Sequence, residues 1–406
     1  MPAKKTTKKK IDLRLIPEIN IGTVGHVDHG KSTLVEAITG KWPATHSEEL
    51  KRGITIKLGY ADGTIYECKK CGFCSTNKCP KCFENCEPVR TVSFVDAPGH
   101  ETLMATVLAG ASLMDAVIFI IAANEKCPQP QTNEHLMVLD ISGLKNIIIV
   151  QTKIDLVSRE RAEESYNEIK EFIKGTVVEN APIIPVSAQQ KVNIDTLLKV
   201  IQEKMETPDR QDKEKAKMYA VRSFDVNKPG SDISKLKGGV LGGALLKGKV
   251  KVGDEVEIKP GVKIKEKWKP IKTKITGLQK AGYDIKEAGP GGLLGLQTTL
   301  DPSLTRADSL GGNVIGIDLP DVLNSLELEV TLLEKIGDQQ INPIKIGEPL
   351  MINVGTAKSL GIVKTSKKKK VSMDLKIPIC ADSNERVVLS RLISDRWRLI
   401  GYGLIK

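Results

Sequence analysis

Residues 25–32 read Gly25-His26-Val27-Asp28-His29-Gly30-Lys31-Ser32, which matches the pattern G-x-x-x-x-G-K-[ST]. A β-branched run, residues 19–24, precedes this stretch, and a helical pattern over residues 33–39 follows it. In such a strand–loop–helix unit the glycines turn backbone N–H groups toward phosphate oxygens, and the helix N-terminus adds a favourable field. We therefore expect Lys31 to contact the β- and γ-phosphates of a nucleotide and Ser32 to bind Mg²⁺.

Short apolar segments alternate with helical patterns up to residue 205. Strands are expected over residues 19–24, 92–95, 117–122, 147–150 and 183–186, and helices over residues 33–39, 101–113, 134–142, 159–173 and 194–205. Nearly continuous β-branched runs suit parallel strands that are buried on both faces. The pattern predicts an α/β P-loop domain with a parallel-rich sheet and flanking helices, in which the carboxyl ends of the strands share one edge.

Three further motifs follow predicted strands. In Asp96-Ala-Pro-Gly99, the carboxylate of Asp96 would hold magnesium through water and the N–H of Gly99 would sense the γ-phosphate. In Thr152-Lys-Ile-Asp155, the carboxylate of Asp155 can accept from N1–H and the N2 amine of guanine, whereas adenine offers neither donor. Ser187-Ala188 would place a backbone N–H on guanine O6.

The sequence thus predicts a site for GTP or GDP at the carboxyl edge of the sheet. The residues expected to contact the nucleotide are Asp28, His29, Gly30, Lys31, Ser32, Thr33, Asp96, Gly99, Thr152, Lys153, Asp155, Ser187, Ala188 and Gln189.

Six of the eight cysteines lie between residues 68 and 86, with the spacing C-x2-C-x2-C-x4-C-x2-C-x3-C. Two C-x2-C knuckles place four thiolates around Zn²⁺, and we expect the ligands to be Cys68, Cys71, Cys79 and Cys82. Cys74 or Cys86 are alternative ligands. An iron–sulfur cluster is the other interpretation, disfavoured because the usual C-x2-C-x2-C-x3-C-P spacing is absent.

The pattern changes after a charged linker at residues 208–217. Two alternating strands flank Gly253-Asp254, a later strand alternates through Leu326, Leu328 and Val330, and glycines are dense between residues 238 and 316. We expect a disordered basic tail at residues 1–15, a nucleotide-binding domain at 16–208 with a zinc-knuckle insert at 66–88, and two all-β barrel domains at 209–324 and 325–406.

The net charge of +11 favours an anionic partner such as nucleic acid. Five lysines of residues 4–10 contribute to it, and residues 367–370 form a second basic run that is expected on a surface turn. Because aromatic residues are only 4% of the chain, phosphate contacts should outweigh base stacking. No signal-peptide pattern is present and the longest apolar run, residues 116–123, is too short to cross a bilayer, so we expect a cytoplasmic protein without a membrane partner.

These motifs resemble those of the translational GTPases of the elongation factor Tu type. The resemblance is carried by residues 25–31, by Arg52-Gly53-Ile54-Thr55, by Asp96-Ala-Pro-Gly-His100 and by Pro130-Gln-Thr-Asn-Glu-His135. Residues 46–53, the cysteine insert and residues 222–230, 238–243 and 396–402 are similar to the family of gamma subunits of archaeal and eukaryotic translation initiation factor 2. The resemblance covers nearly the whole chain.

The resemblance implies a role for each of several residues. His100 would orient the attacking water, and Val27 and Ile54 would form an apolar gate that restrains this water. Thr55 would close over the γ-phosphate and bind Mg²⁺ in a switch segment at residues 46–55. Asp28 and the carbonyl of Gly53 would hold a second Mg²⁺.

The resemblance also implies partners. They are initiator methionyl-tRNA, the alpha and beta subunits of a heterotrimer, the small ribosomal subunit and an activating partner factor that speeds a slow GTPase. Candidate tRNA contacts are Arg222, Lys228 and Lys237. The alternatives are a superfamily GTPase that regulates a metabolic enzyme, such as a sulfate-activating complex, and a nucleotide-binding scaffold without turnover.

One position departs from the family pattern, because Thr152 stands where the family has asparagine. An asparagine amide can bond guanine N7 and also brace the phosphate loop, whereas a threonine hydroxyl is too short for both. We predict that Thr152→Asn keeps the preference for GTP over ATP and tightens GDP modestly in competitive binding assays. Equal binding of ATP and GTP by the native chain would contradict the assignment of Asp155.

Overall fold

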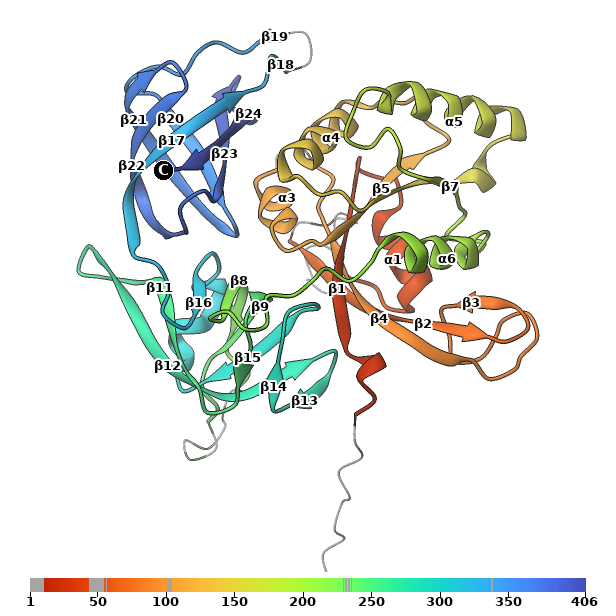
Figure 1. Cartoon of the computed structure of the whole chain (residues 1–406), viewed down its shortest axis with the longest axis horizontal. Helices are drawn as coiled ribbons and strands as arrows, with labels where there is room; N and C mark the ends of the chain where they lie inside the picture. Colours follow the sequence, from red (N-terminus) through yellow and green to blue (C-terminus); the bar gives the residue numbers. More distant parts are fainter. Residues whose placement is uncertain are drawn as a thin grey trace, which may run out of the picture.

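The computed structural model describes residues 11–43, 55, 57–100, 104–228, 230, 232, 234, 236–336 and 339–406 of the 406-residue chain. Three units lie around a common centre, with the α/β unit on one side and two β units on the other (Figure 1). Residues 1–10 of the expected tail lie outside the described residues. Residues 13–15 form a 3₁₀ helix, η1 (Leu13–Leu15), and the carbonyl of Arg14 accepts from Thr91 Oγ1 at 2.8 Å, so these residues are ordered against the sheet.

The α/β unit contains a seven-stranded sheet in the order β3-β2-β4-β1-β5-β6-β7. Its strands are β1 (Pro17–Gly25), β2 (Gly59–Cys68), β3 (Gly72–Cys74), β4 (Glu87–Asp96), β5 (Ala116–Ala122), β6 (Ile147–Thr152) and β7 (Ile183–Pro185). Strands β4, β1, β5, β6 and β7 pair in parallel, which confirms the predicted parallel-rich sheet. The sequence pattern did not reveal β2, which is antiparallel to β4, because Asp62-Gly63 in its middle is typical of a turn.

Helices cover both faces of this sheet (Figure 1). They are α1 (Lys31–Thr39), α3 (Met104–Ala111), α4 (Pro130–Ser142), α5 (Arg159–Ile173) and α6 (Ile194–Lys204), with a 3₁₀ turn η3 (Ile154–Leu156). One apolar cluster packs α1 and α6 against one face, and another packs α3, α4 and α5 against the opposite face. Helix α4 begins at Pro130, before the expected residue 134, since proline suits the first turn of a helix. No helix among the described residues is long and apolar enough to span a membrane.

The second unit is a barrel that closes in the order β11-β16-β8-β9-β15-β12, with β12 returning to β11. Its strands are β8 (Lys217–Phe224), β9 (Val240–Lys247), β11 (Glu255–Ile264), β12 (Lys267–Lys280), β15 (Leu294–Thr298) and β16 (Val314–Gly316), accompanied by β10 (Val250–Lys251), β13 (Tyr283–Ile285), β14 (Glu287–Ala288) and the 3₁₀ helix η5 (Pro302–Asp308). Strands β10 and β11 flank the predicted turn at Gly253-Asp254, but β10 pairs with β14 rather than with β11.

The third unit is a closed six-stranded barrel in the order β17-β22-β21-β20-β23-β24. Its strands are β17 (Val322–Leu332), β20 (Pro349–Val354), β21 (Ala357–Lys367), β22 (Lys370–Cys380), β23 (Arg386–Ile393) and β24 (Arg396–Ile405), with a small ribbon of β18 (Lys335–Ile336) and β19 (Gln339–Gln340). Leu326, Leu328 and Val330 are buried, as their alternation predicted. Residues 368 and 369 form the expected turn between β21 and β22.

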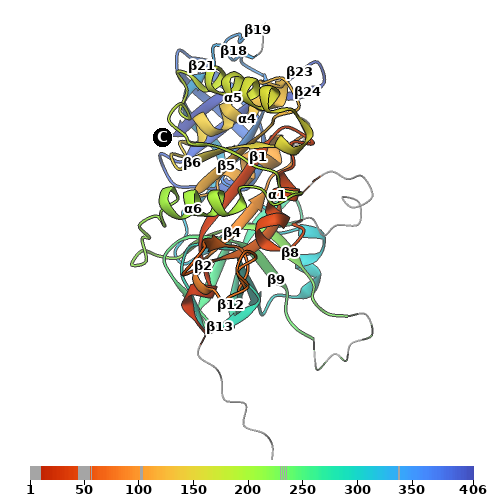
Figure 2. The ribbon, with the colours of Figure 1, turned by 90° about the vertical axis from the view of Figure 1, so that its right-hand side faces the viewer.

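The three units are packed against one another. The apolar cluster under α3 and α4 continues into both barrels through Tyr219 and Leu399, and α4 packs against β24 (Figure 2). Between the barrels, the ammonium group of buried Lys217 lies 2.8 Å from Asp382 and 3.2 Å from Glu385. A shared core and a buried ion cluster therefore join the units.

We predict that Lys217→Met lowers the free energy of unfolding by about 2 kcal/mol, because two carboxylates are left without their cation. Denaturant unfolding followed by fluorescence measures the change. Lys215→Met is the matched control, since the Lys215–Asp318 ion pair is exposed and water screens it, so its loss should have a much smaller effect. Equal effects of the two substitutions would contradict the prediction.

Candidate nucleotide site and cysteine centre

The loop between β1 and α1 follows a path that requires glycine at both ends. A Cβ on Gly25 would lie 2.3 Å from the carbonyl oxygen of Ile120, and Gly30 has φ of 82° directly before α1. Gly30 offers no side chain to accept from the first-turn amides of α1. These amides are therefore suited to an anion, as the sequence predicted for Thr33 and its neighbours.

Lys31 lies under this loop and is almost fully buried. Its ammonium group donates to the carbonyls of Gly25 at 3.0 Å and His26 at 2.7 Å. Burial lowers the pKa of Lys31 to about 8, and the carboxylates of Asp96 and Asp28 oppose this shift. A phosphate at this position would favour the charged ammonium form.

Asp96 at the end of β4 is completely buried and gathers three hydroxyl groups. Thr23 Oγ1 donates to Oδ1 at 2.7 Å, whereas Ser32 Oγ and Thr55 Oγ1 donate to Oδ2 at 2.6 and 3.4 Å. The oxygens of Ser32 and Thr55 are 3.2 Å apart. Burial raises the pKa of Asp96, and the hydrogen bond from Ser32 opposes this. Two hydroxyls and a carboxylate form the hard oxygen set that Mg²⁺ prefers.

The segment after Asp96 approaches the phosphate loop closely. A Cβ on Gly99 would lie 2.5 Å from Lys31 Nζ and 2.8 Å from the backbone nitrogen of Val27. His100 follows directly and is half-buried. Asp28 is exposed, and the other two predicted residues of this region, Gly53 and Ile54, lie outside the described residues.

The residues expected to read the base lie at the ends of β6 and β7. Thr152 is buried and its Oγ1 donates to the carbonyl of His29 at 2.7 Å, so the threonine braces the phosphate loop. Lys153 has φ of 60° and starts η3, which leaves Asp155 exposed. Ser187 Oγ accepts from the N–H of Gln190 at 3.1 Å, which shapes the loop that carries Ala188 and Gln189.

Two buried histidines hold the phosphate loop in place. His29 Nδ1 lies 3.2 Å from the carbonyl of Ile120 and its Nε2 lies 3.3 Å from Glu125, and burial lowers its pKa to about 4. The N–H of Gly25 donates to His135 Nδ1 at 2.7 Å, and burial lowers the pKa of His135 to about 3. His135 is therefore neutral, with its proton on Nε2.

Sequence reasoning did not assign a role to His135, Thr23 or Glu125. His135 was visible only as the last residue of the 130–135 motif. Thr23 carried no signal of its own, since its register position beside Asp96 depends on the pairing of β1 with β4.

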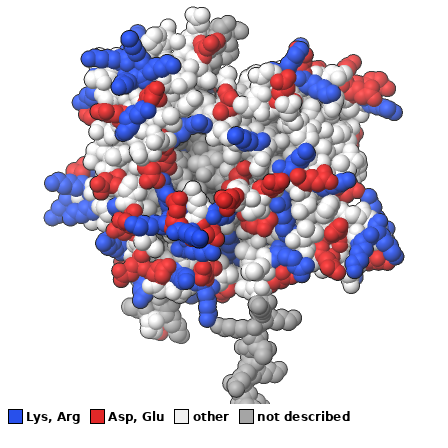
Figure 3. Space-filling view, viewed as in Figure 1, with Lys and Arg blue, Asp and Glu red and all other residues white. Residues whose placement is uncertain are grey.

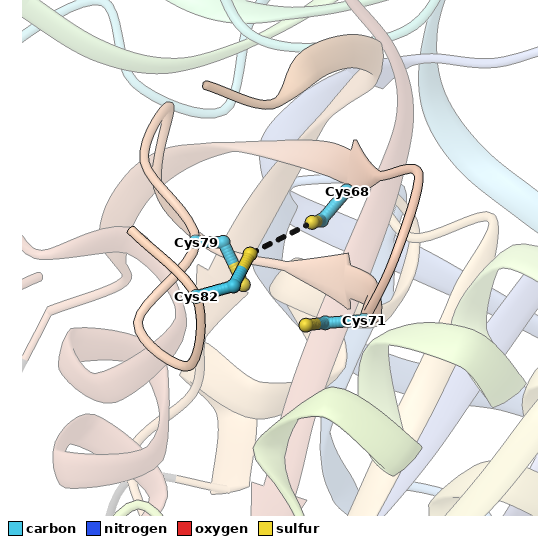
Figure 4. Close-up of side chains that lie close together, drawn as sticks. All are labelled: Cys68, Cys71, Cys79 and Cys82. Carbon is cyan, nitrogen blue, oxygen red and sulfur yellow. Dashed lines mark hydrogen bonds between the residues drawn. The ribbon is translucent and has the colours of Figure 1, made fainter. Parts of the chain in front are cut away.

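The four cysteines chosen from the spacing lie together. Each offers a sulfur within 4.8 Å of the others, and Cys68 and Cys82 are 3.5 Å apart (Figure 4). The backbone N–H groups of Cys82 and Lys81 lower the pKa of Cys79 to about 6, whereas the neighbouring sulfurs of Cys82 and Cys79 raise the pKa of Cys71 to about 12, so Cys79 is the first of the two to become a thiolate. This arrangement fits a tetrahedral zinc site with no open position.

A cavity of about 450 Å³ lies where the three units meet. The space-filling view shows the surface hollowed between the units, with both basic and acidic side chains around the hollow (Figure 3). The walls come from the α/β unit through Lys57 and Thr106, from the first barrel through Arg222, and from the second barrel through Lys358.

Comparisons with known proteins agree with this architecture. A family model described as "Elongation factor Tu GTP binding domain" matches residues 17–207, and one described as "Initiation factor eIF2 gamma, C terminal" matches residues 324–405. The translation initiation factor 2 subunit gamma of Methanothermobacter thermautotrophicus is 55% identical over 96% of this chain and 99% of its own. That of Pyrococcus furiosus is 57% identical over 96% of this chain and 97% of its own.

The chain belongs to the translation initiation factor 2 subunit gamma family. Its α/β unit is a GTP-binding domain, and the chain is a GTPase of translation initiation. Among solved structures, a bacterial selenocysteine-specific elongation factor, EF-Sec, superimposes with a TM-score of 0.75 at 26% identity. The match covers 96% of this chain but only 58% of that protein.

The buried neutral histidines make the GTP-binding domain sensitive to acid. His135 has a pKa of about 3 in the folded chain, against about 6.5 in the unfolded chain. Its contribution to the free energy of unfolding is therefore complete above pH 6.5. As pH falls from 6.5 toward 3, the unfolded chain takes up a proton that the folded chain excludes. We predict that His135 lowers the free energy of unfolding by up to about 1.4 kcal/mol for each pH unit in this range.

His135→Gln keeps an acceptor for the N–H of Gly25 and removes the titration. Denaturant midpoints measured from pH 7 to pH 4.5 should therefore fall less steeply than in the native chain. Asn133→Gln, on the same helix, is the control and should leave the slope unchanged. An unchanged slope in His135→Gln would show that another group accounts for the acid sensitivity.

Proposed function

We propose that the chain carries initiator methionyl-tRNA to the small ribosomal subunit in its GTP state, and that GTP hydrolysis releases the tRNA. The observation that carries this proposal is the cavity of about 450 Å³ where the three units meet. Its walls include Lys57, two residues after Thr55, so a ligand at this place would sense the nucleotide.

The chemistry of the cavity suits a phosphate backbone. Lys57 and Arg222 both bind Asp308, at 2.6 and 2.9 Å, so this carboxylate is shared between two cations. Lys358 Nζ lies 3.4 Å from Thr106 Oγ1, and no carboxylate within the described ranges forms an ion pair with it. Desolvation lowers the pKa of Lys358, and a phosphate would counter this shift.

The connection to the nucleotide runs through a short stretch of chain. Thr55, with its hydroxyl beside Ser32 and Asp96, is two residues from Lys57. We propose that Mg²⁺ and the γ-phosphate fix Thr55, and that Lys57 moves with it. Loss of the γ-phosphate would then alter the cavity wall and release the tRNA.

The roles of the site residues are part of this proposal. The hydroxyls of Ser32 and Thr55 would bind Mg²⁺, with Asp96 holding it through water, and Asp28 with the carbonyl of Gly53 would take a second ion. When bound, Mg²⁺ supplies electrostatic stabilisation of the transferring phosphoryl group.

Hydrolysis would depend on residues beyond the phosphate loop. We propose that His100 orients the attacking water and that Val27 and Ile54 gate its approach. The uncatalysed rate should be slow until an activating partner acts on the small ribosomal subunit. Zn²⁺ bound by the four cysteines would stabilise the insert without taking part in the chemistry.

The chain would act in the cytoplasm as part of a heterotrimer with alpha and beta subunits. We propose domain limits of 16–208, 209–324 and 325–406 for the three units. Family membership disfavours the alternative of a GTPase that regulates a metabolic enzyme, because the related chains are initiation factor subunits.

Filter binding with charged initiator tRNA tests the carrier function. We predict retention with a non-hydrolysable GTP analogue that exceeds retention with GDP, measured for the chain alone and with its partner subunits. Lys358→Ala should weaken retention and reduce the slope of log K against log salt by about 0.7–0.9, the loss of one phosphate contact. Lys364→Ala, an exposed lysine paired with Asp374, is the control. Equal retention of the tRNA with the GTP analogue and with GDP would contradict the proposal.

His100→Ala tests the hydrolysis step separately. We predict a fall in activated turnover of about 10²-fold or more, with GTP binding unchanged, because the loss concerns the orientation of water. Single-turnover hydrolysis on the small ribosomal subunit and equilibrium GTP binding measure the two effects. Unchanged turnover would assign this role to another residue.

A further inference from the structure

Two cysteines of the insert remain outside the four-cysteine centre. Cys74 and Cys86 are both buried, with 5% and 9% of their surface exposed, and their sulfur atoms face each other at 3.1 Å. The four-cysteine group contains neither of them. The structure thus divides the six cysteines into a group of four and a pair.

The insert lacks an apolar core of its own. Its buried cluster consists of the six cysteines and the ring of Tyr66, with no aliphatic side chain among its described members. A unit of this size cannot gain enough stability from burial alone and usually depends on metals or disulfides. A four-cysteine metal site uses four of the sulfurs, and the pair is available for a second cross-link.

Paired backbone holds the two cysteines near each other. Cys74 lies opposite Tyr66 in the ladder of β3 and β2, and the N–H of Cys86 donates to the carbonyl of Asn77 at 2.9 Å. A bridge between Lys78 and Asn85 joins the two segments between them. A disulfide bond needs about 2.05 Å between its sulfurs, so a small side-chain rotation completes the approach.

One of the two cysteines borders a cavity. A cavity of about 420 Å³ lies between the insert and α6, and Cys74 lines it whereas Cys86 does not. Lys81, Lys191 and Asp195 also line this cavity, as do Cys71 and Cys79 of the four-cysteine centre. Ion pairing of Lys81 with Asp195 fixes the insert against α6 at this place.

We propose that Cys74 and Cys86 form a disulfide bond that cross-links the insert beside the four-cysteine centre. The oxidant is a disulfide of low molecular weight, which enters through the cavity at Cys74. The sulfur of Cys74 attacks one sulfur of the oxidant, breaks its S–S bond and releases one thiolate. Cys86 then attacks the mixed disulfide at Cys74 and releases the second thiolate.

The exchange balances without any other reagent. The two cysteine S–H bonds and the S–S bond of the oxidant break, and one S–S bond forms between Cys74 and Cys86. The two protons pass to the two released thiolates, so the protein is oxidised by two electrons and the oxidant is reduced to two thiols. Cys74 is the attacking residue and Cys86 the resolving residue.

The test uses the full-length chain loaded with zinc and treated with oxidised glutathione. Peptide mapping after alkylation should find Cys74 joined to Cys86, and metal analysis should find the zinc content unchanged. In Cys86→Ser the mixed disulfide should remain on Cys74, whereas Cys74→Ser should take up no glutathione in the insert. Cys127→Ser is the matched control for a buried, isolated thiol and should leave the cross-link intact.

Three results would overturn the proposal. One is complete alkylation of Cys74 and Cys86 after treatment with oxidised glutathione, because both thiols would then still be free. Another is loss of zinc in step with oxidation, which would mean that the metal ligands had reacted. The third is a lower zinc content in Cys74→Ser with GDP binding retained, which would make Cys74 a ligand instead of a disulfide partner.

Discussion

A carboxylate with no exposed surface, that of Asp96, holds the functional part of this protein together. An unpaired charge in such a position would destabilise the folded chain by several kcal/mol, and each charge-assisted hydrogen bond stabilises it by about 1.5–3 kcal/mol. The three hydroxyls that supply these bonds come from β1, from α1 and from Thr55. The same group therefore fixes the sheet, the start of α1 and Thr55 relative to one another.

Other long-range contacts support the phosphate loop from outside. Thr152 on β6 binds the carbonyl of His29, and His135 on α4 binds the N–H of Gly25. Glu134, next to His135 in the chain, forms an ion pair with Arg398 on β24 of the second barrel. The N-terminal half of α4 thus contacts both the nucleotide loop and a barrel, beside the apolar cluster that the units share.

Thr152 shows how one residue can be read differently from sequence and from structure. From the sequence, Thr152 stands where the family has asparagine, and its hydroxyl is too short to contact the base and brace the phosphate loop at once. In the folded chain its hydroxyl takes over one part of that role, the bracing of the loop, because a short side chain at the end of β6 reaches His29 directly. Asp155, which the sequence predicts to read the guanine, is exposed at the end of β6.

The sequence by itself determined the order of the nucleotide motifs, the α/β unit followed by two barrels, and four cysteines suited to zinc. These are local properties, since the periodicity of a strand or helix and the spacing of a knuckle are written within a few residues. Only the tertiary structure decided the contacts of Thr23 and His135, the existence of β2, the proximity of Cys74 to Cys86 and the cavity between the units. Each depends on contacts between segments whose distance in space follows from sheet order and domain packing, which no local pattern encodes.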